Sequence, residues 1–251
     1  MQQYITDKSE VDFIFEYPDS NDQIFSELKN ITGFNLNSDK NEIEKAKIIT
    51  DYVHNLFQHS GDNKPSSLNP VTIINEAREG KSFRCVEYSH LTTALLWAFN
   101  IPSRSVSLKT KDMETREIGA GHVVVEFYSS EYNKWIMIDV QEGVLFKSEN
   151  AYLSAFELSE KINNNTPIEF ITTDNSNYPK KEVYTKWIKE YLYFFETPIK
   201  IDFEGIITNE DRLNAKRLML VPLDSENPKV FQKIFPINAI YTHSILDFYK
   251  K

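Results

Sequence analysis

The sequence is short of several features, and each shortage excludes a class of protein. Cysteine occurs once in 251 residues, so no disulfide can form within the chain, as suits a reducing compartment. Glycine occurs seven times, which is too few for a low-complexity chain. No apolar run approaches the about 18 residues of a membrane span, and the N-terminus lacks a basic stretch followed by an apolar one. We therefore expect a cytoplasmic protein without a signal peptide and without a membrane partner.

Positively charged residues are also fewer than negatively charged ones. The chain has 28 Lys and Arg residues against 37 Asp and Glu residues, a formal net charge of −9. Nucleic-acid binding needs a basic face, so no nucleic-acid partner is expected. The sequence has no paired Cys-x-x-Cys, no His-x-x-x-His and no glycine-rich phosphate loop. We therefore expect neither a metal nor another cofactor.

The residues that are present predict an α+β fold. Hydrophobic residues make up 41% of the chain and aromatic residues 13%, enough for a substantial core. Apolar spacing and turn residues predict helices followed by strands, with antiparallel pairing across a hairpin loop at 129–133. The last hundred residues should extend the same body, so that 1–251 form one domain. The expected helices are 22–30, 38–57 (capped by Ser38 or Asp39), 70–79 (capped by Asn69), 86–100 (with Cys85 at its start), 151–158 and 182–195, and the expected strands are 103–110, 122–128, 134–140, 199–207 and 216–223.

The single cysteine lies in the stretch GKSFRCVEYSH, where a loop turns into a helix. A thiol is a poor nucleophile until it becomes a thiolate, and the free N–H groups and dipole of a helix N-terminus favour that charge. A neighbouring histidine would help further as a proton acceptor. By itself, however, a cysteine is more often a small buried apolar residue than a nucleophile.

Two downstream residues suit such a cysteine. GAGHVVVEFY places His122 at the head of one expected strand, and KWIMIDVQ places Asp139 near the end of the next. Asp139 follows three apolar residues in a run that looks buried, and a buried carboxylate needs a partner. A histidine on the adjacent strand could be that partner. The two residues lie directly opposite each other if the hairpin turns between Ser130 and Glu131.

The order of cysteine helix, histidine strand and aspartate strand resembles the transglutaminase-like superfamily of cysteine enzymes. FRCVEYSHLTTALLWAFNIPSRSV is similar to the family's cysteine helix and following strand, and DYVHNLFQHSGDNKPS is similar to bacterial members. The resemblance covers roughly 43–146 and leaves 147–251 as an extension packed on that core. It implies a papain-like α+β core, with helices packed on an antiparallel sheet and the catalytic cysteine at a helix N-terminus. It also implies a triad of Cys85 as nucleophile, His122 as general base and acid, and Asp139 as its orienting group.

The chain departs from the family pattern at two points. Arg84 precedes the cysteine where many members have glycine, and we expect it to pair with an acidic neighbour such as Glu87. The run RCVEY is similar to the peptide N-glycanase branch, but the paired zinc cysteines of that branch are missing. By analogy with papain-like enzymes, Gln58 is a candidate donor to the oxyanion, although His59 is equally near. His54 is expected to be structural.

These residues predict a cysteine-dependent enzyme that transfers the acyl group of an amide or peptide bond, with a peptide or protein as its substrate. We expect hydrolysis, because nothing in the sequence indicates a calcium loop or an amine-binding tail. The alternatives are transamidation of protein glutamine, a catalytically inactive binding or scaffold protein on the same fold and, more remotely, a thiol redox sensor.

Overall fold

The computed structural model describes residues 2–36, 40–173, 180–203 and 216–251, and its helices and strands agree with an α+β fold. The helices are α1 (Gln23–Thr32), α2 (Glu42–Leu56), α3 (Pro70–Arg78), α4 (Cys85–Ala98), α5 (Ala155–Asn163), α6 (Lys181–Lys189) and α8 (Ile245–Phe248). The strands are β1 (Ser103–Lys109), β2 (Gly121–Ser129), β3 (Lys134–Asp139), β4 (Val144–Ser148), β5 (Ala151–Tyr152), β6 (Glu169–Thr172), β7 (Phe194–Pro198), β8 (Arg217–Leu220), β9 (Val230–Phe231), β10 (Phe235–Pro236) and β11 (Ala239–Thr242).

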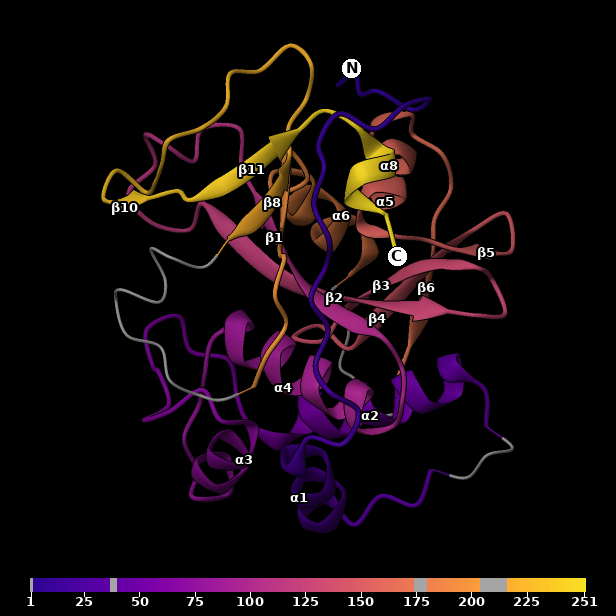
Figure 1. The fold of residues 1–251 in the computed structure, drawn as a ribbon, viewed down its shortest axis with the longest axis vertical. Coiled ribbons are helices and arrows are strands. Elements are labelled where there is room, and N and C mark those ends of the chain that lie inside the picture. Colours follow the sequence, from indigo (N-terminus) through magenta and orange to yellow (C-terminus); the bar gives the residue numbers. More distant parts are fainter. Residues whose placement is uncertain (1, 37–39, 174–179, 204–215) are drawn as a thin grey trace.

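A largely antiparallel sheet forms the centre of the described structure (Figure 1). Its strand order is β11-β8-β7-β1-β2-β3-β4-β5, and β6 pairs with β4 on the side of the path. The pair of β8 and β11 is parallel, whereas the pairs of β1, β2, β3 and β4 are antiparallel. Hairpin-connected strands of this kind can place neighbouring side chains on one face, which the candidate site requires.

Helices cover the sheet on two sides. In Figure 1, α1–α4 lie together below the strands, while α5, α6 and α8 lie towards the other end. Side chains alternate along β2, so that Val125 packs in the core formed with α1–α4, whereas Val124 packs in the core formed with α5, α6 and α8. Two separate cores thus share the central strands. Helices packed on a mostly antiparallel sheet confirm the expected fold class.

Local sequence signals set where several helices begin. Asn41 caps α2 in a reciprocal arrangement with Glu44, and Ser154 does the same for α5 with Glu157. Pro70 occupies the first position of α3, where its missing N–H has no intrahelical role. The caps proposed for α2, Ser38 and Asp39, lie outside the described residues, and the cap that the structure shows is Asn41.

Three of the expected elements in the last hundred residues were wrong in part. The helix expected at 182–195 stops at Lys189, because Phe194 and Phe195 enter β7 and pair with β1 and β8. The helix expected at 151–158 begins later, since β5 precedes the cap of α5. Of the strand expected at 199–207, the described part, 199–203, lies outside any strand, and the remainder lies outside the described residues. In the first of these cases, pairing between distant segments overrode local propensity.

The C-terminal extension, 147–251, contributes strands to the same sheet as the 43–146 core. Glu196 of β7 lies opposite Ser107 of β1, and β8 and β11 continue the sheet beyond β7. Near the other end of the chain, Ile5 bridges to Ser244. The single-domain organisation stays a prediction, but these pairings show how the extension is attached to the core.

A buried ion pair ties the C-terminal helix to the sheet. Arg104 of β1 and Glu126 of β2 are 1% and 0% exposed, and their side chains form a salt bridge at 2.8 Å. Arg104 also donates to the carbonyl of Phe248 at 2.7 Å, and Tyr249 donates to Glu126 at 3.0 Å. Buried charges need such ion-pair and hydrogen-bond partners, because removing one partner leaves the other charge unpaired in a medium of low polarity.

In the described part of the chain, we find no helix that combines the length and the apolar character needed to cross a membrane.

The Glu126→Gln variant tests the importance of the buried pair. We expect it to lower the free energy of unfolding by about 3 kcal/mol or more, because Arg104 keeps its charge without a carboxylate partner. Urea denaturation measures this. The matched control is Glu117→Ala, which removes a carboxylate that is 77% exposed from its pair with Lys233 and should leave the midpoint nearly unchanged. Equal midpoints for the two variants would contradict the expectation.

Candidate active site

Cys85 is the first residue of α4 and is partly exposed. The loop before it is held against an upstream segment, since the N–H of Phe83 donates to the carbonyl of Gln58 at 3.1 Å and the N–H of Ser60 donates to the carbonyl of Phe83 at 2.7 Å. The first N–H groups of a helix have no intrahelical acceptor. The thiol therefore lies where backbone donors and the helix dipole favour negative charge, as the sequence predicted.

An ion pair fixes the start of this helix. The Glu87 carboxylate accepts from the backbone N–H of Arg84 at 3.0 Å and from its Nε at 3.1 Å. Glu87 is fully buried, so the guanidinium supplies the charge that balances it. The hydroxyl of Tyr88 donates to the carbonyl of Phe57 at 2.6 Å. The expected pairing of Arg84 with Glu87 is confirmed, and Glu87 and Tyr88 both serve the structure.

His122 and Asp139 meet inside the protein. His122 Nε2 lies 2.8 Å from Asp139 Oδ2, and the two side chains are 3% and 0% exposed. The register expected for this contact was wrong. Val125 lies opposite Ile138, so His122 and Asp139 are diagonal neighbours on one face. A diagonal pair is still within reach of an imidazole and a carboxylate.

Asp139 has further partners. The hydroxyl of Tyr184, on α6, donates to Asp139 Oδ2 at 2.8 Å. The backbone N–H of Glu142 donates to Oδ1 at 3.3 Å. A buried carboxylate must be satisfied in this way, so the aspartate is held by three groups from three different segments.

Aromatic side chains from the C-terminal extension surround the imidazole. The ring of Trp187, on α6, packs edge-on against His122 with centroids 4.8 Å apart, and that of Tyr191 lies 6.2 Å away. In the sequence, the density of aromatic residues in this region predicts packing, with the lining of a cleft as the alternative. Tyr184, Trp187 and Tyr191 are thus site residues that sequence reasoning missed.

The surroundings of His122 favour its protonated form. Burial acts to lower its pKa, but the carboxylate of Asp139, its hydrogen bond and the hydrogen-bonding interaction with the Cys85 side chain raise the pKa to about 10. Since Nε2 is engaged by Asp139, Nδ1 is the ring nitrogen that remains for Cys85. The structure therefore brings Cys85, His122 and Asp139 together, and their catalytic roles stay predictions.

Two more titratable side chains lie near this group. The pKa of His59 is lowered by burial and by repulsion from His122. The pKa of Glu142 is raised by burial and by the charge of Asp139. Both residues belong to loops, one before the cysteine helix and one after β3. Both residues therefore belong to the electrostatic surroundings of His122 and Asp139.

The structure also describes the other residues that the sequence singled out, Gln58 and His54. The Gln58 side chain is exposed, and its backbone carbonyl is the group that pairs with Phe83, so its role towards an oxyanion stays a prediction. His54 Nδ1 lies 3.2 Å from the carbonyl of Val140, which agrees with a structural role. No group of three His, Cys, Asp or Glu side chains in the described ranges is arranged to hold a metal ion.

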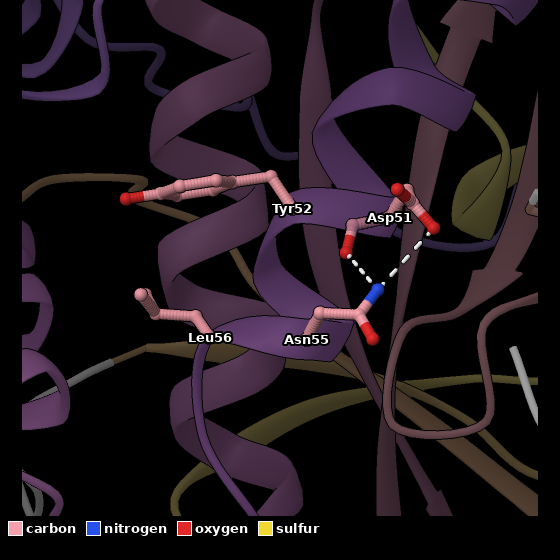
Figure 2. A pocket seen from close by; sticks show the side chains of 4 residues that line it. All are labelled: Asp51, Tyr52, Asn55 and Leu56. Carbon is pink, nitrogen blue, oxygen red and sulfur yellow. Dashed lines mark hydrogen bonds between the residues drawn. The ribbon is translucent and has the colours of Figure 1, made fainter. Parts of the chain in front are cut away.

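A separate hollow of about 350 Å³ lies beside α2 and is lined by Asp51, Tyr52, Asn55 and Leu56. Figure 2 shows Asn55 donating to Asp51, at 2.7 Å to the backbone carbonyl and 3.3 Å to the carboxylate. None of these lining residues belongs to the group around Cys85. The hollow presents one carboxylate already engaged within its own helix and supplies no nucleophile.

Residues 32–140 match the transglutaminase-like superfamily model, and this segment holds Cys85, His122 and Asp139. This match confirms the resemblance seen in the sequence. No curated protein matches the chain.

Two solved structures resemble parts of the chain. One is a "putative cysteine protease" from Cytophaga hutchinsonii, with 22% identity and a TM-score of 0.37 over 51% of this chain and 40% of that one. The other is a "putative protease" from Parabacteroides distasonis, with 18% identity and a TM-score of 0.33 over 46% of this chain and 22% of that one. The chain thus aligns with less than half the length of either protein.

The raised pKa of His122 predicts how stability depends on pH. A folded-state pKa of about 10 against 6.5 for the free side chain gives stability that is complete below about pH 6.5 and lost as the pH rises towards 10. Unfolding free energies of the wild type and of His122→Gln, measured from pH 6 to 10, should therefore converge as the pH rises. A difference that stays constant or grows over this range would contradict the charged pair.

Proposed function

We propose that the protein is a cysteine-dependent acyl-transfer enzyme that hydrolyses an amide bond in a peptide or protein. The observation that carries the proposal is the buried His122, which lies between the Asp139 carboxylate and the Cys85 side chain. A nucleophile, a base and a group that orients the base form a recurrent arrangement for nucleophilic acyl transfer. The superfamily of residues 32–140 supports it.

The first half of the reaction follows from the positions of these groups. The Cys85 thiolate attacks the amide carbonyl carbon, a carbon–sulfur bond forms, and the carbonyl electron pair moves to the oxygen. The proposed donors to that oxygen are the N–H of Cys85, at the helix start, and Gln58. The His122 imidazolium then gives its proton to the amide nitrogen, the carbon–nitrogen bond breaks, and the amine leaves a thioester behind.

The second half restores the enzyme. Neutral His122 takes a proton from water, the hydroxide oxygen bonds to the thioester carbon, and the carbon–sulfur bond breaks to release a carboxylic acid and the Cys85 thiolate. Asp139 stabilises the imidazolium at each stage and fixes its tautomer through Nε2. An amine in place of water would give transamidation through the same thioester, so the nature of the acceptor separates the two activities.

Alkylation of the thiol tests whether the pair is assembled. Cys85 is the only cysteine, so iodoacetamide reports on it without background. We expect fast alkylation that persists near pH 6 and is slowed about tenfold or more in His122→Ala, because a thiolate stabilised by imidazolium exists below the usual thiol pKa. The control is His243→Ala, whose ring nitrogen contacts the Val221 carbonyl. A slow alkylation whose pH dependence is that of an ordinary thiol, and whose rate His122→Ala leaves unchanged, would refute the proposal.

Substrate turnover tests the reaction itself. A peptide library incubated with the wild type should show cleavage that falls by about a thousandfold or more in Cys85→Ala, as expected when a nucleophile is removed. Mass spectrometry with and without an added primary amine distinguishes the products. A new carboxylic acid supports hydrolysis, and an acyl group found on the amine supports transamidation instead. Cleavage no greater than that of Cys85→Ala would refute the catalytic proposal.

A further inference from the structure

Asp139 Oδ2 receives two hydrogen bonds of the same length. One comes from His122 Nε2 and the other from the Tyr184 hydroxyl, each at 2.8 Å. All three side chains are buried, with exposed fractions of 3% or less. The imidazole and the phenol therefore share one buried carboxylate oxygen.

Tyr184 is held firmly in this position. Its ring stacks on Phe146 and meets Phe170 edge-on, both with centroids 5.5 Å away, and Trp187 lies 5.6 Å away on the same helix. Its hydroxyl has a single acceptor, Asp139, among the hydrogen bonds of the described residues. Rings packed on this scale have little freedom, so the phenol presents its O–H in a fixed direction.

We propose that Tyr184 is a positioning residue, which fixes Asp139 Oδ2 towards His122 and takes up part of its negative charge. The inference rests on the proposed function only in treating His122 and Asp139 as the working pair. It assigns the C-terminal extension a part in the site, because Tyr184 and the neighbouring Trp187 both come from α6. The segment that matches the superfamily model, 32–140, is then incomplete without this helix.

The charge-sharing has a measurable consequence at His122. A hydrogen bond to a carboxylate stabilises its charge and weakens its pull on other donors. Without the hydroxyl, Oδ2 attracts the His122 proton more strongly. The other titratable groups near this pair are Cys85, His59, Glu142 and Tyr191, and a Tyr184 variant retains all four.

The test compares the fraction of His122 that is protonated at the midpoint of the wild-type titration, measured by NMR of protein carrying ¹⁵N-histidine. We expect Tyr184→Phe to raise that fraction, corresponding to a pKa rise of about half a unit or more. The matched control is Tyr249→Phe, which removes a hydroxyl from another buried carboxylate, Glu126, at 3.0 Å. That control should leave the His122 titration unchanged. Equal fractions in the two variants, or a lowered fraction in Tyr184→Phe, would overturn the proposal.

A second measurement avoids reliance on a variant that could fold poorly. Fluorotyrosine placed at position 184 keeps the ring and the hydroxyl but makes the phenol a stronger donor, so the protonated fraction of His122 should fall. No change, or a rise, would overturn the proposal. The alkylation profile of the wild type separates this result from the proposed function. An ordinary thiol profile refutes catalysis by Cys85, whereas opposite shifts in the two Tyr184 proteins still establish the positioning role.

Discussion

The site depends on one constraint, which is that a carboxylate buried in a protein must find donors. Asp139 is fully buried at the end of β3, and its charge is compatible with folding only because His122, Tyr184 and the Glu142 N–H all donate to it. These donors come from a strand, a helix and a turn. Satisfying one side chain therefore fixes the relative positions of three segments, and the imidazole that results faces Cys85.

The sheet makes this convergence possible. Alternation along β2 directs Val125 into the core with α1–α4 and Val124 into the core with α5, α6 and α8. His122 shares the second face, where α6 supplies Tyr184 and Trp187. Cys85 comes from α4, in the layer of helices on the other face. The site thus forms where two cores meet, so both halves of the chain contribute to it.

Much of the candidate site could be predicted from the sequence because its signals are local. A loop that becomes a helix at Cys85, a histidine at a strand head and an aspartate within an apolar run are each visible in a few residues. The register of the hairpin was not predicted correctly, because Val125 and Ile138 pair through the packing of both strands. His122 and Asp139 are nevertheless in contact, because diagonal neighbours on one face are also within reach.

The sequence alone determined the fold class, the helix that begins at Cys85 and the three residues that carry the superfamily pattern, since periodicity, turn residues and residue spacing act over short distances. Only the tertiary structure decided that Phe194 and Phe195 enter a strand, that Tyr184 donates to Asp139 and that Trp187 covers His122. Such contacts join segments tens of residues apart. They depend on burial and hydrogen bonding in the finished fold, which local propensity does not encode.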